Sequence, residues 1–121
     1  MSEAYPGAGP DSGWSDAGYR PIAYTSTVWR DSIDQAGSVK VQPGVDLSAA
    51  FHKYGFTWEA NRQSFYYDGQ LVYQLDVNMP DPMYLIFNLW FGGPAGEPDS
   101  STPTGKSNSL EINYVRAWKF K

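Results

Sequence analysis

The stretch that determines the fold is residues 51–75, FHKYGFTWEANRQSFYYDGQLVYQL. Aromatic and β-branched residues fill 54–59 and 64–68, and a polar turn at 60–62 separates these two runs. The dipeptide Asp68-Gly69 between apolar runs is a strong signal for a tight hairpin, which residues 70–75 would complete. The stretch therefore predicts three short antiparallel strands.

The flanking sequence extends the same pattern. Residues 22–30, IAYTSTVWR, have strand composition, and VKVQ at 39–42 predicts a further short strand. Residues 83–91 are apolar almost throughout, which predicts a strand buried on both faces, and residues 109–119 alternate like a half-buried strand. No amphipathic helix of ten residues is evident, so the pattern predicts an all-β antiparallel sandwich or barrel.

Composition narrows the class of protein and of partner. The 121 residues suffice for one domain, and a hydrophobic content of 41% with 18% charged residues is typical of a globular chain. The net charge of -4 argues against nucleic acid or a membrane surface as partner and fits a neutral polymer. The absence of cysteine excludes disulfides and thiolate metal sites. No signal peptide is visible in residues 1–10, and no run is long enough to span a membrane.

Aromatic residues make up 17% of the chain, including five Trp and nine Tyr. Large aromatic side chains serve two purposes, because they fill a β core and also stack on the apolar faces of sugar rings. Composition alone leaves these two readings open.

Five segments together resemble glycoside hydrolase family 16, the laminarinase and β-glucanase family. They are YTSTVW (24–29), FHKYGFTW (51–58), SFYYDGQLVY (64–73), PMYLIFNLWFGG (82–93) and LEINYVRAW (110–118), in family order. The resemblance implies an antiparallel β-sandwich of the concanavalin A-like jelly-roll type, of which the chain would hold only the C-terminal half. Residues 1–121 would then form one partial domain, with a loop-rich start at the catalytic strand (1–21) followed by strands (22–121).

The resemblance also implies a catalytic role for Glu3. The family signature E-x-D-x-x-E supplies a nucleophile, an orienting Asp and an acid/base, and its last Glu is often followed by Ala-Tyr, as Glu3 is here. Glu3 would be the acid/base, and the other two carboxylates would lie upstream of Met1, which we interpret as an internal methionine of a longer parent. The implied reaction is retaining endo-hydrolysis of a β-linked polysaccharide of the β-1,3 or β-1,3-1,4-glucan type.

Five residues are expected to bind substrate. Two of them, Asn88 and Trp90, would share one face of the 83–91 strand, where Trp90 replaces a small residue of the family. Trp29 stands where the family usually carries His, on a face that it shares with two threonines. Tyr5 follows Glu3 in the catalytic motif, and Trp14 lies in the long N-terminal loop.

Whether the chain is itself an enzyme stays open. An acid without its nucleophile cannot form the glycosyl-enzyme intermediate, and only Asp11 or Glu97 could approach Glu3 through loops. The alternatives are a non-catalytic carbohydrate-binding module and an inactive truncated product. We expect no cofactor and no metal, since the spacing of the acidic residues does not support the structural Ca²⁺ of some family members.

Half a sandwich would leave strand edges and apolar faces uncovered. We therefore expect a protein partner that covers them, either an N-terminal half on another chain or a second copy of this one. The other expected partner, implied by the resemblance, is a polysaccharide. Family members are usually extracellular or periplasmic.

Overall fold

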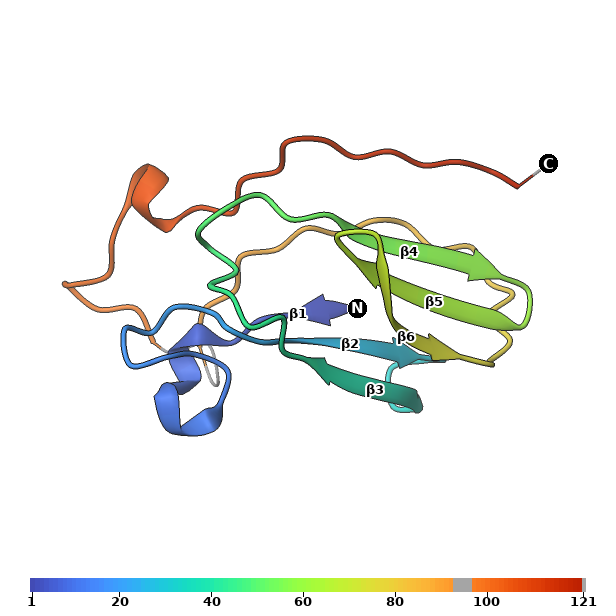
Figure 1. Cartoon of the computed structure of the whole chain (residues 1–121), viewed down its shortest axis with the longest axis horizontal. Helices are drawn as coiled ribbons and strands as arrows, with labels where there is room; N and C mark the ends of the chain where they lie inside the picture. The colour runs from blue at the N-terminus through green and yellow to red at the C-terminus, as the bar shows by residue number, and fades with distance from the viewer. Residues whose placement is uncertain (93–96, 121) are drawn as a thin grey trace.

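The computed structural model describes residues 1–92 and 97–120, so Gly93 at the end of one quoted motif lies outside the described residues. The described chain is all-β, with two three-stranded antiparallel sheets and no α-helix in the described ranges (Figure 1). This arrangement fits a partial β-sandwich of the jelly-roll type and confirms the predicted fold class. The first sheet has the order β1-β2-β3 and the second the order β4-β5-β6. The elements are β1 (Ser2–Glu3), η1 (Pro6–Ala8), η2 (Pro10–Ser12), β2 (Tyr24–Trp29), β3 (Gln35–Val41), β4 (Tyr54–Glu59), β5 (Arg62–Tyr67), β6 (Gln70–Leu75) and η4 (Gly105–Asn108).

The second sheet is the predicted double hairpin. Strands β5 and β6 meet at Asp68 and Gly69, whose φ angles of 48° and 85° are the left-handed pair that a tight hairpin turn requires. The Asp68 carboxylate accepts a 2.8 Å hydrogen bond from the Lys53 backbone N–H and lies 2.8 Å from His52 Nδ1. Asp68 and His52 therefore stabilise the hairpin turn that the sequence predicts at Asp68-Gly69.

The first sheet has two distinct faces, which the pairing register defines. Cross-strand pairs Tyr24↔Val41 and Val28↔Gly37 lie on one face, and Thr25↔Lys40 lies on the other, because paired residues share a face and neighbours alternate.

The two sheets pack through the face that carries Tyr24. The Tyr24 ring lies 5.2 Å from the Tyr54 ring in an edge-to-face arrangement and 5.8 Å from the Tyr67 ring. Beside it, Gly37 approaches β6 so closely that an added Cβ would meet the Tyr73 hydroxyl and come within 3.0 Å of a Leu75 methyl group. The buried apolar residues of this core are few, namely Ala23, Tyr24, Val28 and Phe65.

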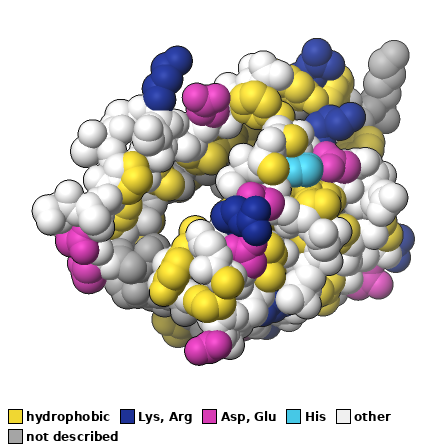
Figure 2. All heavy atoms as spheres, turned by 60° about the vertical axis from the view of Figure 1, so that its left-hand side comes forward, with side chains coloured by type: hydrophobic (Ala, Val, Ile, Leu, Met, Phe, Trp, Pro, Cys, Tyr) yellow, Lys and Arg dark blue, Asp and Glu magenta, His cyan; other side chains and the backbone are white. Residues whose placement is uncertain are grey.

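The predicted strands at 83–91 and 109–119 do not form in this structure. Both segments are exposed and without strand pairing: Tyr84 is 84% exposed and Trp118 is 81% exposed. A strand needs a neighbouring strand to satisfy its backbone groups, and within the described ranges no strand pairs with either segment. Figure 2 shows the result, with hydrophobic side chains reaching the surface around an opening through the middle of the molecule. Among the described residues, no helix has the length and apolarity needed to cross a membrane.

Candidate functional site

Glu3 lies on β1, at the edge of the first sheet. The strand pairs with β2 through Ser2↔Ser26 and Glu3↔Thr25, and Thr25 in turn pairs with Lys40 of β3. Glu3, Thr25 and Lys40 therefore form one row across the sheet, on the face opposite Tyr24. The Glu3 side chain is half-buried. Because the second sheet packs on the Tyr24 face, the face that carries Glu3 points away from that sheet.

Tyr5 follows Glu3 by two residues, and the Trp14 ring packs on the Tyr5 ring. Their rings are 5.2 Å apart and nearly perpendicular, at 83°. Burial raises the pKa of the Tyr5 hydroxyl to about 12, with smaller contributions from a hydrogen bond to Glu3 and from the negative charge of that carboxylate. Three of the predicted site residues are therefore brought together by the fold, although they come from a strand and two parts of a loop.

The loop that carries Trp14 is fixed by backbone contacts. The Trp14 N–H donates a 3.1 Å hydrogen bond to Ser12 Oγ, and the Trp14 carbonyl accepts one of 3.0 Å from the Ile22 N–H. The neighbouring Ser15 is buried and forms a bridge with Pro21. The Trp14 backbone is consequently held through both its N–H and its carbonyl, whereas the direction of the indole depends on side-chain contacts.

Lys40 joins this group, and sequence reasoning missed it. Its Nζ lies 4.4 Å from the centre of the Trp14 ring and donates a long hydrogen bond, 3.4 Å, to the Ser12 carbonyl. The sequence signal was the alternating VKVQ strand, but alternation alone does not say which strand lies alongside or which face meets Glu3.

The other predicted binding residues lie elsewhere. Trp29 ends β2 beyond a register shift after Val28 and is 37% exposed. Asn88 and Trp90 lie in the unpaired 83–91 segment, where Trp90 is 53% exposed. Among the hydrogen bonds and aromatic contacts of the described residues, none joins these three to Glu3.

Asp11 and Glu97, the two candidates for a second carboxylate, lie apart from the group around Glu3. Asp11 lies in η2, and Glu97 follows the residues that the structure does not describe; both are exposed. No cluster of three or more His, Cys, Asp or Glu suited to a metal occurs in the described part of the chain.

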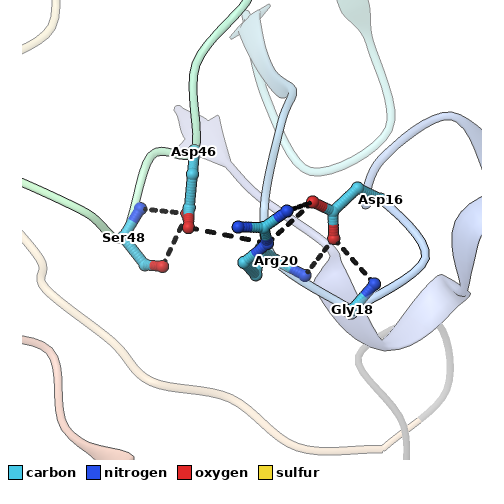
Figure 3. A network of polar contacts seen from close by, with 5 residues as sticks. All are labelled: Asp16, Gly18, Arg20, Asp46 and Ser48. Carbon is cyan, nitrogen blue, oxygen red and sulfur yellow. Dashed lines mark hydrogen bonds and ion pairs between the residues drawn. The ribbon is translucent and has the colours of Figure 1, made fainter.

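The acidic residues Asp16 and Asp46 hold the N-terminal loop in place (Figure 3). Asp16 accepts hydrogen bonds from the Arg20 side chain at 2.7 Å and from two backbone N–H groups, at Gly18 and Arg20. These bonds hold the pKa of Asp16 below its usual value, and the Arg20 side chain makes the largest contribution. Arg20 also lies 3.9 Å from Asp46, whose carboxylate accepts two bonds from Ser48. The network ties the loop to the segment after β3, which is a structural role.

Comparison with known proteins identifies relatives over most of the chain. Residues 16–116 match the model of "Glycosyl hydrolases family 16", a range that begins after Glu3, Tyr5 and Trp14. The chain is 30% identical over 103 residues to the endo-1,3-1,4-beta-glycanase EglC of Rhizobium meliloti, which covers 84% of this chain and 22% of that protein. It is 44% identical over 78 residues to a beta-glucanase of Acetivibrio thermocellus, or 60% of this chain and 22% of that protein.

A beta-glucanase of Bacillus licheniformis is 34% identical over 84 residues, which cover 65% of this chain and 33% of that protein. The chain thus spans about a fifth to a third of the length of these relatives. No solved structure is a significant match. The family match extends over most of the chain and includes all five strands from β2 to β6, so the chain belongs to glycosyl hydrolase family 16.

Proposed function

We propose that the chain is part of a glycosidase domain that acts on β-glucan, with Glu3 as the acid/base of the reaction. The observation that carries the proposal is the position of Glu3 on a sheet face beside the Tyr5 and Trp14 rings. A carboxyl group beside aromatic rings suits a reaction on a sugar, because the rings can stack on the sugar while the acid protonates the glycosidic oxygen. Glu3 lies outside the family match, so its role rests on its sequence context and this geometry.

The names of the relatives support the class of substrate. The proteins from Rhizobium meliloti, Acetivibrio thermocellus and Bacillus licheniformis are named as endo-1,3-1,4-beta-glycanase or beta-glucanase. We therefore propose endo-hydrolysis of a β-1,3- or β-1,3-1,4-linked glucan for the whole protein to which this sequence corresponds.

A retaining reaction needs a second carboxylate at a distance of about 5–5.5 Å from the first. In the described ranges, the carboxylates with hydrogen bonds or ion pairs serve turns and loops, as Asp16, Asp46 and Asp68 do. We propose that the nucleophile comes from strands outside this sequence, and that these strands also cover the exposed 83–91 and 109–119 segments. The large apolar side chains that both segments expose support this part of the proposal.

The remaining aromatic residues fit further sugar contacts. Trp29 lies two positions along β2 from Thr27 and four from Thr25. Strand alternation therefore puts Trp29 on the face that carries Glu3, although the pairing with β3 shifts in register after Val28. We propose that Trp29 binds a sugar ring further along that face. Asn88 and Trp90 would contribute to the same surface once the 83–91 segment joins a sheet.

A binding module without catalytic activity is the second candidate. The observation that favours it is that no described contact brings a second carboxylate to Glu3, whereas the aromatic pair is already assembled. Binding and hydrolysis must therefore be tested separately.

The decisive experiment uses the purified chain with laminarin and mixed-linkage β-glucan. Affinity electrophoresis measures binding, and reducing-end release measures hydrolysis, with and without formate as an external nucleophile. We expect binding without hydrolysis in plain buffer, because the nucleophile is missing, and slow cleavage when formate takes its place. Glu3→Gln should abolish the formate-dependent cleavage and preserve binding.

Three outcomes would change the assignment. Binding with no formate-dependent cleavage would favour the binding module. Hydrolysis in plain buffer that depends on Glu3 would mean that the chain, or a dimer of it, supplies its own second carboxylate. Absence of both binding and cleavage would refute the proposed function.

A further inference from the structure

The Lys40 side chain contacts the loop that carries Trp14 at two points. Its Nζ lies over the Trp14 indole at 4.4 Å from the ring centre and donates to the Ser12 carbonyl at 3.4 Å. The loop passes close above this ammonium group, because a Cβ added at Gly13 would lie 3.0 Å from Lys40 Nζ. The side chain thus lies against three consecutive loop residues, although it is exposed to solvent.

The two ends of this contact differ in how firmly they are held. Lys40 belongs to the β2–β3 ladder through its pairing with Thr25, so its backbone is fixed by the sheet. Trp14 belongs to a segment of short 3₁₀ turns, η1 and η2, followed by Gly13 in a left-handed conformation, φ 70°. Lys40 therefore links a rigid strand to a loop that has little regular structure of its own.

The Lys40 ammonium group lies over the face of the Trp14 ring, as expected for a cation–π contact. A lysine ammonium within about 6 Å of an indole centre is attracted by the negative face of the ring. Within the described ranges, none of the ion pairs involves Lys40, although Glu3 lies in the same row across the sheet. The side chain is therefore directed to Trp14 and not to a carboxylate.

The contact between Lys40 and Trp14 is linked to Glu3 through Tyr5, on which Trp14 packs. Trp14 packs edge-to-face on Tyr5 at 5.2 Å, and Glu3 contributes to the raised pKa of the Tyr5 hydroxyl. A ring that stacks on a sugar must already be in place to bind tightly, because ordering a mobile side chain on binding costs affinity.

We infer that Lys40 is a positioning residue, which fixes the Trp14 ring against Tyr5 so that both stand ready beside Glu3 to bind a neutral β-linked glucose ring. The choice of ligand rests on the proposed function. The positioning of Trp14 does not, because it follows from contacts within the chain.

The test compares Lys40→Met, which keeps the length of the side chain and removes its charge, with Lys40→Arg, which keeps the charge. Lys106→Met is the matched control, since Lys106 lies in η4 and its side chain is exposed. The first readout is the indole N–H resonance of Trp14 in the ligand-free chain, identified by its disappearance in Trp14→Phe. The second readout is the affinity for laminarin and mixed-linkage β-glucan.

We expect Lys40→Met to shift the Trp14 resonance and to weaken glucan binding by about two- to fivefold, the factor that an exposed cation–π contact corresponds to. Lys40→Arg should restore both readouts, and Lys106→Met should change neither. An unchanged Trp14 resonance in Lys40→Met would overturn the inference, even if binding weakened, because Lys40 would then act on the sugar directly.

A third outcome separates this inference from the proposed function. If the wild-type chain binds neither glucan while the Trp14 resonance still depends on Lys40, the proposed function and the ligand are refuted and the positioning of Trp14 is upheld. If binding is present and Lys40→Met matches the wild type in both readouts, the proposed function stands and the role of Lys40 is refuted.

Discussion

Gly37 is the position where the two sheets come closest, and Gly37→Ala should destabilise the chain. The new Cβ would meet the Tyr73 hydroxyl and would lie 3.0 Å from a Leu75 methyl group, so β3 and β6 would have to separate. Overpacking costs about 1–3 kcal/mol, and relief of the glycine penalty in a strand returns about 0.5–1 kcal/mol, which leaves a net loss of about 1–2 kcal/mol.

Thermal or urea unfolding followed by tryptophan fluorescence measures this loss. At about 4 °C per kcal/mol for a chain of this size, the midpoint should fall by several degrees. The direct check is a double-mutant cycle with Tyr73→Phe, which removes the atom that the new Cβ meets. Tyr73→Phe should recover part of the loss in the Gly37→Ala background, with a coupling of about 0.5 kcal/mol or more.

Two results would refute this reasoning. Gly37→Ala as stable as the wild type would mean that the sheets are not packed at this point. Destabilisation without coupling to Tyr73→Phe would mean that the strain lies elsewhere. Gly18→Ala is the matched control, because its Cβ would meet only side-chain atoms of an exposed turn, at 3.4 Å or more.

Three further predictions concern single groups. Glu3→Gln should lower the pKa of Tyr5 from about 12 but leave it above 10.0, since burial, the largest cause, remains; tyrosine ring NMR against pH measures this, and an unchanged value would contradict the Glu3 contact. The backbone N–H of Lys53 and the His52 ring lower the pKa of Asp68. The stability that Asp68 adds over Asp68→Asn should therefore be present above about pH 4 and disappear as the pH falls through the lowered pKa. A difference in unfolding free energy between the two proteins that does not change with pH would refute this. Trp58→Phe should cost about 1 kcal/mol of unfolding free energy, because the Trp58 Nε1–H donates a 2.6 Å hydrogen bond to the Met79 carbonyl, and an equally stable variant would show that this bond contributes nothing.

The second sheet could be predicted because its signals are local. Asp68-Gly69 selects a tight turn wherever it stands between two strand-forming runs, and the structure has the hairpin at that position. The same holds for 24–29, where β-branched and aromatic residues form β2. The strands at 83–91 and 109–119 were predicted by equally local signals and did not form. Composition shows that a segment can be a strand, but a strand also needs a neighbour to pair with.

The candidate site was likewise predictable only where the signal is local in the sequence. The sequence indicates Glu3 and Tyr5 because they lie two positions apart in one motif, and Trp14 because of its place in a long loop. Their assembly depends on the β1–β2 pairing and on the edge-to-face packing of two rings, which no spacing in the sequence encodes. Lys40 was overlooked because its role appears only when the register sets it in the row of Glu3 and the loop folds over it.

The amino-acid sequence by itself determined the family and the all-β class, and it supplied the residues that we propose act on a sugar. Those properties depend on residue identity and on short-range order, which a chain carries before it folds. Only the tertiary structure decided that Trp14 packs on Tyr5 and that Lys40 reaches Trp14, while no described contact brings Trp29, Asn88 or Trp90 to Glu3. Contacts between residues far apart in the chain depend on strand register and on which faces pack together, and a shift of one residue in register would move Lys40 to the opposite face of the sheet.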